Sequence, residues 1–399
     1  MKKTKLEQWI CETEGLPELT REALEYLQLQ KLNAMLERMH QRDGRYPARV
    51  ETLAELRKLP FTTPEMLAEQ PGRFLVTSQS EIQRVISGAT SGTTGPAKRV
   101  FYTAQDTEHT VGFFAAGISE MLQAGEKCLI AFPFTGPFGL GDLIAQAVER
   151  LGGIPVKAGF GQTWTELTEL VRQTQPETYI GFPVTLLGLA RMYGEAFPIR
   201  RALVSGDACP KGVMKALEGV LGNKLYPHYG SRECGLGGAV TCPAFEGMHL
   251  RENHILAEII DESGEPVPDG EYGELVITTI GMEAMPLIRY RTGDYTRFLP
   301  PCACGGVTKR LDTVTRKEDA PVSMEALDSL LFPIPELVDY EAHWDGRLHV
   351  RVKALEDIRE EIHNTIYVNY RLDAGIAVER TCPEDRPMYL GKRYVKRTE

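Results

Sequence analysis

The chain has 399 residues, of which 42% are hydrophobic and 25% charged, as in a globular protein with a sizeable core. This length exceeds one ordinary domain and predicts two. The net charge of −10 argues against a nucleic-acid partner, because neutralising phosphates requires clustered lysines and arginines. No apolar run reaches about 18 residues, so neither a membrane-spanning helix nor a membrane partner is expected. The basic start MKKTK precedes no apolar signal segment, so we expect a cytoplasmic protein whose eight cysteines are buried thiols or metal ligands.

The first part of the chain, residues 1–80, is expected to be helical. In TREALEYLQLQKLNAMLERMH, leucines and methionines recur at helical spacing, with Thr20 as a candidate N-cap and Gly44 as a stop. From about Arg84, short apolar runs such as KCLIAFPF, IPVKAG, ETYIGFP and RALVSGD alternate with helical stretches such as GDLIAQAVERLG and WTELTELVRQTQ. Strands that alternate with helices predict an α/β layer with largely parallel strands.

After Asn253 the pattern becomes strand-rich. HILAEIIDESGEPVPDGEYGELVITTI predicts two strands around a Gly/Pro-marked turn. Farther on, ELVDYEAHWDGRLHVRVKAL alternates like strands, DIREEIHNTIYVNYRL has a helical apolar face, and IAVER predicts a further strand. We therefore expect an α/β protein with a large domain over residues 1–310, containing α/β layers and a β-rich part, and a small α+β domain over residues 311–399.

The segment TSGTTGPAK has the composition of an anion-binding loop. It is not a Walker A loop, because Lys98 stands three residues after the last glycine, with Pro96 between. Glycines nevertheless let backbone N–H groups turn toward an anion, while hydroxyls add donors and a lysine adds charge. The alternative is an ordinary surface loop of this composition. The candidate ligands are Thr90, Ser91, Gly92, Thr93, Thr94, Gly95 and Lys98.

Two carboxylates in turns are candidate ligands of a nucleotide and its metal. Glu233 lies in HYGSRECGLGG, and a loop carboxylate near a phosphate-binding loop is a natural ligand of Mg²⁺. Asp294 lies in the tight turn of PLIRYRTGDYTRF, where a fixed carboxylate can accept hydrogen bonds from a ribose diol. The alternatives are a solvated glutamate and a turn-forming aspartate.

A second constellation has the donor set of a structural zinc site. Cys242 and His249 lie in TCPAFEGMHL, and Cys302 and Cys304 lie in PPCACGG. Three cysteines and one histidine complete a tetrahedral site with no open position. The spacing is irregular for a zinc finger, so reduced cysteines in loops are the alternative. Cys234 is expected to pack rather than to bind metal.

In this order and at these separations, the segments resemble the adenylate-forming superfamily of acyl-CoA ligases, nonribosomal adenylation domains and luciferases. The phenylacetate–CoA ligase family is the most similar, over nearly the whole chain. LQLQKLNAML and LRKLPFTTPEML resemble the family's N-terminal helices and its LPFTTK segment, and SGDA stands where the family has GAEP. DGEYGELVITTIGMEAMPLIRYRTGDYTR is similar almost position for position to the family's GELVFTTLTKEALPVIRYRTRDLTR.

The resemblance implies a role for each matching residue. Residues 90–95 and Lys98 would hold the β- and γ-phosphates of ATP, Glu233 would bind Mg²⁺, and Asp294 would hold the ribose. The adenine pocket would be lined by Gly206, Asp207 and Ala208, with Tyr229, Gly230 and Ser231 nearby. Lys392, after a glycine in PMYLGKRYVKRTE, would be the catalytic lysine that neutralises charge on the α-phosphate. Some relatives carry a similar Cys/His pattern and bind structural zinc.

The sequence also departs from the family pattern. Arg232 stands where a threonine or serine usually precedes the metal-binding glutamate, and KRLDTVTRKED replaces the hinge pattern GRxDD. Either Arg310 or Arg316 is therefore the candidate second ribose ligand, and Asp312 is the candidate hinge residue.

Aromatic residues beside Gly and Pro predict an apolar or aryl acid site, with plain core packing as the alternative. They are Phe132, Phe134, Phe138 and Phe182. The resemblance thus implies an AMP-forming ligase that joins a small carboxylic acid to coenzyme A, with a homodimer left open. The alternatives are an adenylyltransferase that modifies a coenzyme without thiol transfer, and a catalytically silent nucleotide-binding regulator.

Overall fold

The structure is a computed structural model that describes residues 4–88, 98–136, 138–222, 224–318, 320–388 and 391–397. Their contacts form two compact units. Unit 1 comprises Met1–Glu120 and His228–Val314, and unit 2 comprises Met121–Pro227 and Thr315–Glu399. The domain division at residues 310 and 311 stays a prediction.

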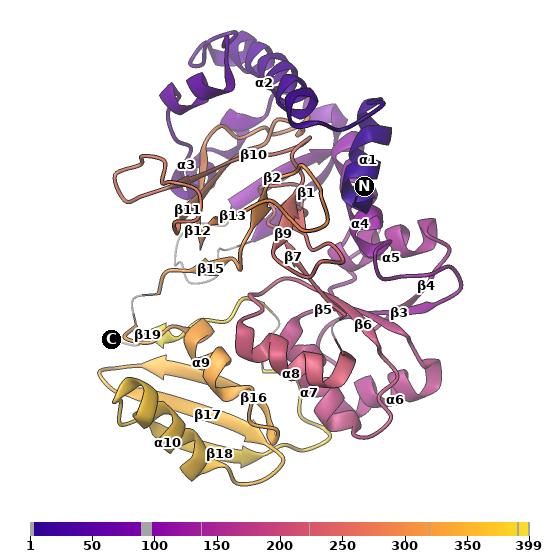
Figure 1. The fold of residues 1–399 in the computed structure, drawn as a ribbon, viewed down its shortest axis with the longest axis vertical. Helices are drawn as coiled ribbons and strands as arrows, with labels where there is room; N and C mark the ends of the chain where they lie inside the picture. Colours follow the sequence, from indigo (N-terminus) through magenta and orange to yellow (C-terminus); the bar gives the residue numbers. More distant parts are fainter. Residues whose placement is uncertain are drawn as a thin grey trace. The chain divides into compact units, whose positions relative to one another are not determined.

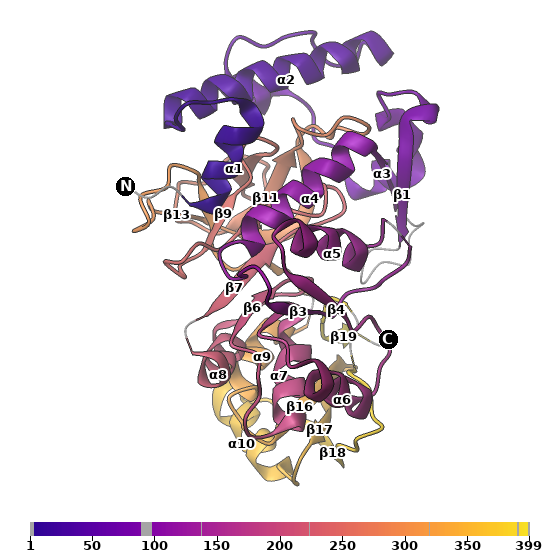
Figure 2. The ribbon, with the colours of Figure 1, turned by 90° about the vertical axis from the view of Figure 1, so that its right-hand side faces the viewer.

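The helices of unit 1 come mainly from its N-terminal part. They are α1 (Lys5–Glu14), α2 (Arg21–Asp43), α3 (Pro64–Glu69) and α4 (Ala104–Ile118), with short 3₁₀ turns at Leu53–Lys58, Pro71–Phe74 and Gln79–Glu81. The ends predicted for α2 are confirmed, since Thr20 Oγ1 accepts from the Ala23 N–H and Gly44 closes the helix with φ 68°. Helix α1 packs along α4 (Figure 2).

The strands of unit 1 are antiparallel. β1 (Ile82–Gly88) pairs with β2 (Lys98–Thr103), and β10 (Leu256–Ile260), β11 (Gly273–Thr278) and β12 (Tyr290–Thr296) pair in that order (Figure 1). A further ladder joins β13 (Phe298–Leu299), β14 (Arg310–Leu311), β9 (Met248–Leu250), β8 (Ala239–Val240) and the end of β7 (Leu225–Tyr229). This part confirms the strand-rich segment expected after Asn253.

Unit 2 contains the predicted parallel sheet. β4 (Ile154–Lys157), β3 (Lys127–Ile130), β5 (Thr178–Gly181), β6 (Arg201–Val204) and the start of β7 are parallel neighbours in that order. The helices between them are α5 (Leu140–Arg150), α6 (Trp164–Thr174), α7 (Pro183–Tyr193) and α8 (Lys211–Leu221). Every strand and helix predicted here from the alternation of apolar runs is present.

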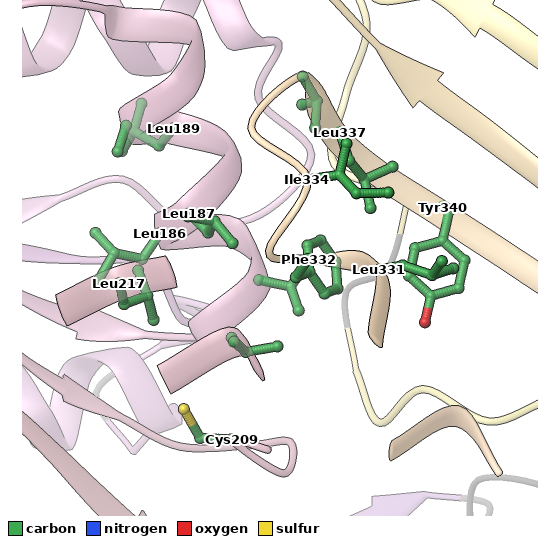
Figure 3. Close-up of a cluster of buried hydrophobic side chains, with 14 of the residues drawn as sticks. Leu186, Leu187, Leu189, Cys209, Leu217, Leu331, Phe332, Ile334, Leu337 and Tyr340 are labelled. Carbon is green, nitrogen blue, oxygen red and sulfur yellow. The ribbon is translucent and has the colours of Figure 1, made fainter. Parts of the chain in front are cut away.

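The C-terminal part of unit 2 is the predicted α+β region. β16 (Leu337–Trp344) and β17 (Leu348–Ala354) form a hairpin, and β18 (Gly375–Arg380) and β19 (Lys396–Arg397) add to it in parallel. α9 (Met324–Leu331) and α10 (Arg359–Tyr370) complete the region, while β15 (Thr315–Arg316) precedes it in the chain and is not part of its sheet. Figure 3 shows why it belongs to unit 2, because Phe332, Ile334 and Leu337 share one apolar core with Leu186 and Leu187 of α7. Mixed α/β architecture confirms the predicted fold class.

Within the described residues, no helix is both long enough and apolar enough to cross a membrane.

Candidate active site

Three side chains from separate segments of unit 1 meet in a buried cluster. Lys98 begins β2, Glu233 lies in the turn after β7, and Tyr290 begins β12. Lys98 Nζ donates to Glu233 Oε1 and lies 2.8 Å from Tyr290 Oη, and Tyr290 Oη lies 3.2 Å from Glu233 Oε1. The structure therefore brings together a predicted phosphate ligand and the predicted magnesium ligand.

The charges in this cluster depend on each other. Burial opposes ionisation of Glu233, whose exposed fraction is 5%, but the ion pair and hydrogen bond with Lys98 outweigh it. The pKa of Glu233 consequently lies below its ordinary value. Glu233 is thus ionised at neutral pH, as a carboxylate that is to bind a hard cation must be.

The turn that carries Glu233 is fixed by backbone contacts. The Leu236 N–H donates to Ser231 O over 2.8 Å, and Tyr102 Oη donates to Arg232 O. Gly230 is required here, because a Cβ at this position would lie 2.1 Å from Leu236 O. Among the atoms that the structure describes, the buried Ser231 Oγ has no hydrogen-bond partner. A ligand that offers a donor or acceptor at this turn would satisfy it.

Asp294 lies on strand β12 with Tyr290, so the tight turn predicted at this position is wrong. Alternation along β12 buries Tyr290, Thr292 and Asp294 on one face. Tyr229 Oη donates to Asp294 Oδ2 over 2.9 Å, and the Asp294 N–H donates to Thr292 Oγ1 over 3.0 Å. Burial, followed by the neighbouring Asp294 charge, raises the pKa of Tyr229, so this hydroxyl stays a donor.

The candidate second ribose ligands have different surroundings. Arg310 is buried and donates to the backbone carbonyls of Glu246 and Pro300, so its guanidinium braces two loops. Arg316 is half-buried on β15. Asp312, the candidate hinge residue, accepts from Tyr272 Oη and from Arg297 Nε, each over 2.9 Å. Their roles in ribose binding and in hinge motion stay predictions.

The residues expected to line the adenine pocket lie in unit 2, in the turn after β6, which is called the adenine turn below. Gly206 has φ +85°, and a Cβ there would lie 2.5 Å from Phe182 Cε1, so the turn packs directly on an aromatic ring. Asp207 Oδ1 accepts from the Ala208 N–H over 2.9 Å, and Asp207 Oδ2 accepts from the Arg393 N–H over 3.2 Å. Lys392 is half-buried in the same unit, directly before Arg393.

Some of the predicted aromatic residues form a cluster beside this turn. The rings of Phe132 and Phe182 have centroids 5.1 Å apart, and Phe160 lies 5.9 Å from Phe182. Phe134 instead lies under the Lys157 ammonium at 5.1 Å, and Phe138 is half-buried just before α5. Phe160, which the sequence analysis did not identify, is 37% exposed and forms the open side of the cluster.

The four predicted zinc ligands come together in unit 1. One donor atom from each of Cys242, His249, Cys302 and Cys304 lies within 4.8 Å of the others. Cys242 Sγ and Cys302 Sγ are 3.7 Å apart, and Cys304 Sγ and His249 Nε2 are 3.4 Å apart. Backbone N–H groups of Ala244 and Gly306 donate to Cys242 Sγ and Cys304 Sγ, as they would to thiolates.

A second layer of contacts orients the histidine. His249 Nδ1 lies 2.8 Å from Thr308 Oγ1, and Thr308 Oγ1 lies 3.3 Å from Glu7 Oε1 of α1. Because the Thr308 hydroxyl donates to this carboxylate, its oxygen is free to accept from Nδ1–H, which leaves Nε2 as the ligand atom. Burial lowers the pKa of His249 to about 4 and raises the pKa of Cys242. The imidazole is therefore neutral, and the donor set fits a tetrahedral Cys₃His metal site.

Residues 90–95 of the predicted phosphate loop lie outside the described residues. Sequence reasoning missed Tyr290, Arg393 and Glu7. The period-2 pattern of YRTGD could have identified Tyr290, since it shares a strand face with Asp294. No local signal marks Glu7, whose carboxylate meets Thr308 across 301 positions of sequence.

Comparison with known proteins shows the family of the chain. Residues 89–284 match the family model described as AMP-binding enzyme. A phenylacetate–coenzyme A ligase of Pseudomonas putida is 31% identical over 320 residues, covering 75% of this chain and 71% of that protein. One from Thermus thermophilus is 29% identical over 363 residues, covering 82% of this chain and 79% of that protein.

Solved structures show the same fold at lower identity. A 2-hydroxyisobutyryl-CoA ligase in its postadenylation state, in complex with an acyl adenylate, superimposes with a TM-score of 0.75 at 19% identity, covering 92% of this chain and 88% of that one. The same enzyme with the adenylate and CoA gives 0.70 at 19% identity, covering 95% and 91%. From the sequence relatives, the family model and this fold, we conclude that the chain belongs to the phenylacetate–CoA ligase family of AMP-binding, adenylate-forming enzymes.

Proposed function

We propose that the chain joins an apolar or aryl carboxylic acid to coenzyme A in two half-reactions. As an AMP-forming acid–CoA ligase, it first lets the carboxylate oxygen attack the α-phosphorus of ATP, which expels pyrophosphate and leaves an acyl adenylate. The CoA sulfur then attacks the acyl carbon, AMP leaves, and the thiol proton passes to solvent. The observation that supports this proposal most is the buried Lys98–Glu233–Tyr290 cluster in a member of this family.

The cluster is suited to exchange partners when the nucleotide binds. In its present state Lys98 and Glu233 neutralise each other inside unit 1. A triphosphate offers anionic oxygens to Lys98, while a bound Mg²⁺ would offer positive charge to Glu233 and shield the phosphates. Each buried charge thus keeps an opposite partner, and Tyr290 Oη stays within reach of either group.

Asp294 and Ser231 supply the neighbouring polar contacts. Tyr229 holds the carboxylate of Asp294 in place, and ribose hydroxyls would donate to its oxygens. The buried Ser231 Oγ would gain its missing partner from the nucleotide. Lys392 would neutralise the charge that develops on the α-phosphate as the acid attacks.

The aromatic cluster of unit 2 is the proposed acid site. Phe182 contacts Phe132 and Phe160 and lies against Gly206, so an apolar acid stacked there would end near the adenine turn. Aromatic walls favour an aryl or alkyl group over a charged one.

The Cys₃His cluster is proposed to hold a structural Zn²⁺. It would join the segment after β8 to the loop that follows β13 and, through Thr308 and Glu7, to α1. Zinc bound by reduced thiolates suits the cytoplasmic location that we propose. Cys302→Ser should lose one equivalent of zinc while the exposed Cys382→Ser keeps it, and full zinc content in both proteins would refute the ligand assignment.

The test of the proposed function is pyrophosphate exchange into ATP with phenylacetate and a panel of other apolar acids, with and without CoA. We expect acid-dependent exchange, thioester formation when CoA is added, and loss of exchange in Lys392→Ala. No exchange with any acid would refute the proposal in favour of a silent regulator. Exchange without a thioester would refute it in favour of an adenylyltransferase.

A further inference from the structure

The C-terminal segment that carries Lys392 has one buried side and one more exposed side. Arg393 and Val395 are 7% and 5% exposed, whereas Lys392 and Tyr394 are half-buried. Alternating burial is typical of an extended backbone, in which neighbouring side chains point in opposite directions. Whatever fixes Arg393 therefore also fixes the direction of Lys392.

The Arg393 side chain is anchored deep in unit 2. One guanidinium nitrogen lies 2.5 Å from Asp328 Oδ1, and the other donates to Tyr340 O over 2.9 Å. Tyr340, labelled in Figure 3, donates its hydroxyl to the same Asp328 oxygen over 2.5 Å. Because both charges are almost completely buried, neither is tolerated without the other.

Asp207 attaches the same segment to the predicted adenine turn. One carboxylate oxygen accepts from the Ala208 N–H within the turn, and the other accepts from the Arg393 N–H beside Lys392. Asp207 and Arg393 also line a small cavity with Gly391 and Phe182. An aspartate accepts with both oxygens, whereas an asparagine of the same size accepts with only one.

We propose that Asp207 and Arg393 are positioning residues that hold Lys392 for adenylate formation, with Asp207 coupling nucleotide binding at the adenine turn to the placement of the lysine. The proposal rests on the proposed function for the catalytic role of Lys392. Neither residue needs to touch the reacting atoms. Because coupling is reciprocal, a nucleotide that orders the turn strengthens the hold on the lysine segment, and a docked segment strengthens nucleotide binding.

The state of the Asp207 carboxyl should be visible in the pH profile. Four groups face it, namely Arg393, Asp328, Asp339 and the thiol of Cys209. Burial, opposed by Arg393, raises the pKa of Asp207 to about 7. Protonation removes one acceptor site, so adenylate formation should decline as the pH falls through about 7.

The first experiment measures hydrogen exchange of the full chain in peptides that cover residues 391–397, with and without AMP. In the wild type, AMP should slow exchange of the Arg393 amide. In Asp207→Asn, this amide should exchange at least tenfold faster and AMP should not slow it. Glu318→Gln is the matched control, since Glu318 accepts from the Val395 N–H over 2.8 Å without contacting the turn. It should retain the effect of AMP, and an unchanged Arg393 amide in Asp207→Asn would overturn the proposal.

The second experiment separates the two half-reactions, using phenylacetate or whichever panel acid supports exchange. Asp207→Asn should lower kcat for pyrophosphate exchange about tenfold or more, raise KM for ATP, and flatten the pH profile near 7. At saturating acyl adenylate and CoA, kcat for thioester formation should fall far less than kcat for pyrophosphate exchange, although KM for the adenylate should rise together with KM for ATP. Arg393→Lys should retain more exchange activity than Arg393→Met. A parallel loss of both half-reactions would indicate a merely structural role and overturn the proposal.

The outcomes also separate this proposal from the proposed function. If the wild type shows no exchange with any acid, the proposed function fails, and the hydrogen-exchange result still decides the link between Asp207 and the lysine segment. A different outcome is that the wild type shows pyrophosphate exchange and Lys392→Ala does not. If Asp207→Asn then matches the wild type in kcat and pH profile, only the positioning role fails.

Discussion

The buried Lys98–Glu233 pair gives the sharpest stability prediction. Lys98→Met keeps most of the apolar stem but leaves Glu233 without its cation. In the native pair the side chains of Lys98 and Glu233 are 7% and 6% exposed. Breaking a buried pair from one side costs about 3–5 kcal/mol. For a chain of this length that unfolds as one unit, this corresponds to a fall in Tm of roughly 4–6 °C.

The pH dependence should reverse sign between the two proteins. In the wild type the pKa of Glu233 lies below its ordinary value, so its contribution to stability is present above about pH 4.3 and is lost as the pH falls through the folded pKa. Without Lys98, burial dominates and raises that pKa. Stability of the variant is then lost as the pH rises through the folded pKa, and the deficit in Tm should be larger at pH 7.5 than at pH 5.

Thermal unfolding of four proteins tests this reasoning. Lys98→Met should be destabilised, the double variant Lys98→Met/Glu233→Gln should recover most of the loss, and Lys58→Met should shift little. Lys58 pairs with Glu55 at 3.2 Å, but its side chain is 75% exposed, and exposed pairs contribute about 0–1 kcal/mol. An equal deficit for Lys98→Met at both pH values, or no recovery in the double variant, would refute the electrostatic account.

Three further predictions concern other contacts. Glu7→Gln should weaken zinc binding about 10–100-fold in a chelator competition, since it alters the carboxylate that accepts from the Thr308 hydroxyl. Unchanged zinc affinity would count against a role for this contact in orienting His249. Gly230→Ala should destabilise the chain by about 1–3 kcal/mol in urea titrations, because its Cβ would lie 2.1 Å from Leu236 O; wild-type stability would contradict it. Asp294→Asn should raise KM for ATP about tenfold with little change in Tm, and an unchanged KM would argue against a ribose contact.

Periodicity in the sequence predicted most of the fold because each pattern is local. The strands of unit 2, the hairpin of β16 and β17, and the helix between Thr20 and Gly44 all follow from apolar spacing and capping residues. Turn residues also marked the loop that carries Glu233, whereas Asp294, expected in a tight turn, lies within β12. The resemblance to a family then gave these two residues an expected chemistry that spacing alone left open.

The contacts that complete the sites could not be predicted in this way. Tyr290 reaches Lys98 across 192 positions, and Arg393 reaches Asp328 across 65. Such pairs depend on how distant elements pack, and no short-range period records that. Asp207 illustrates the difference, because the resemblance assigns it to the adenine pocket but does not show that its second oxygen binds the Arg393 N–H.

The contact between Glu7 and Thr308 has a consequence for synthesis of the chain. At about 5–20 residues per second, roughly 15–60 seconds separate the emergence of these two residues from the ribosome. Throughout that interval α1 lacks the loop that binds its carboxylate, although α4, against which it packs, is made well before Thr308. The contact that secures α1 to Thr308 is thus formed late in synthesis, and a chaperone would have this interval in which to bind the helix.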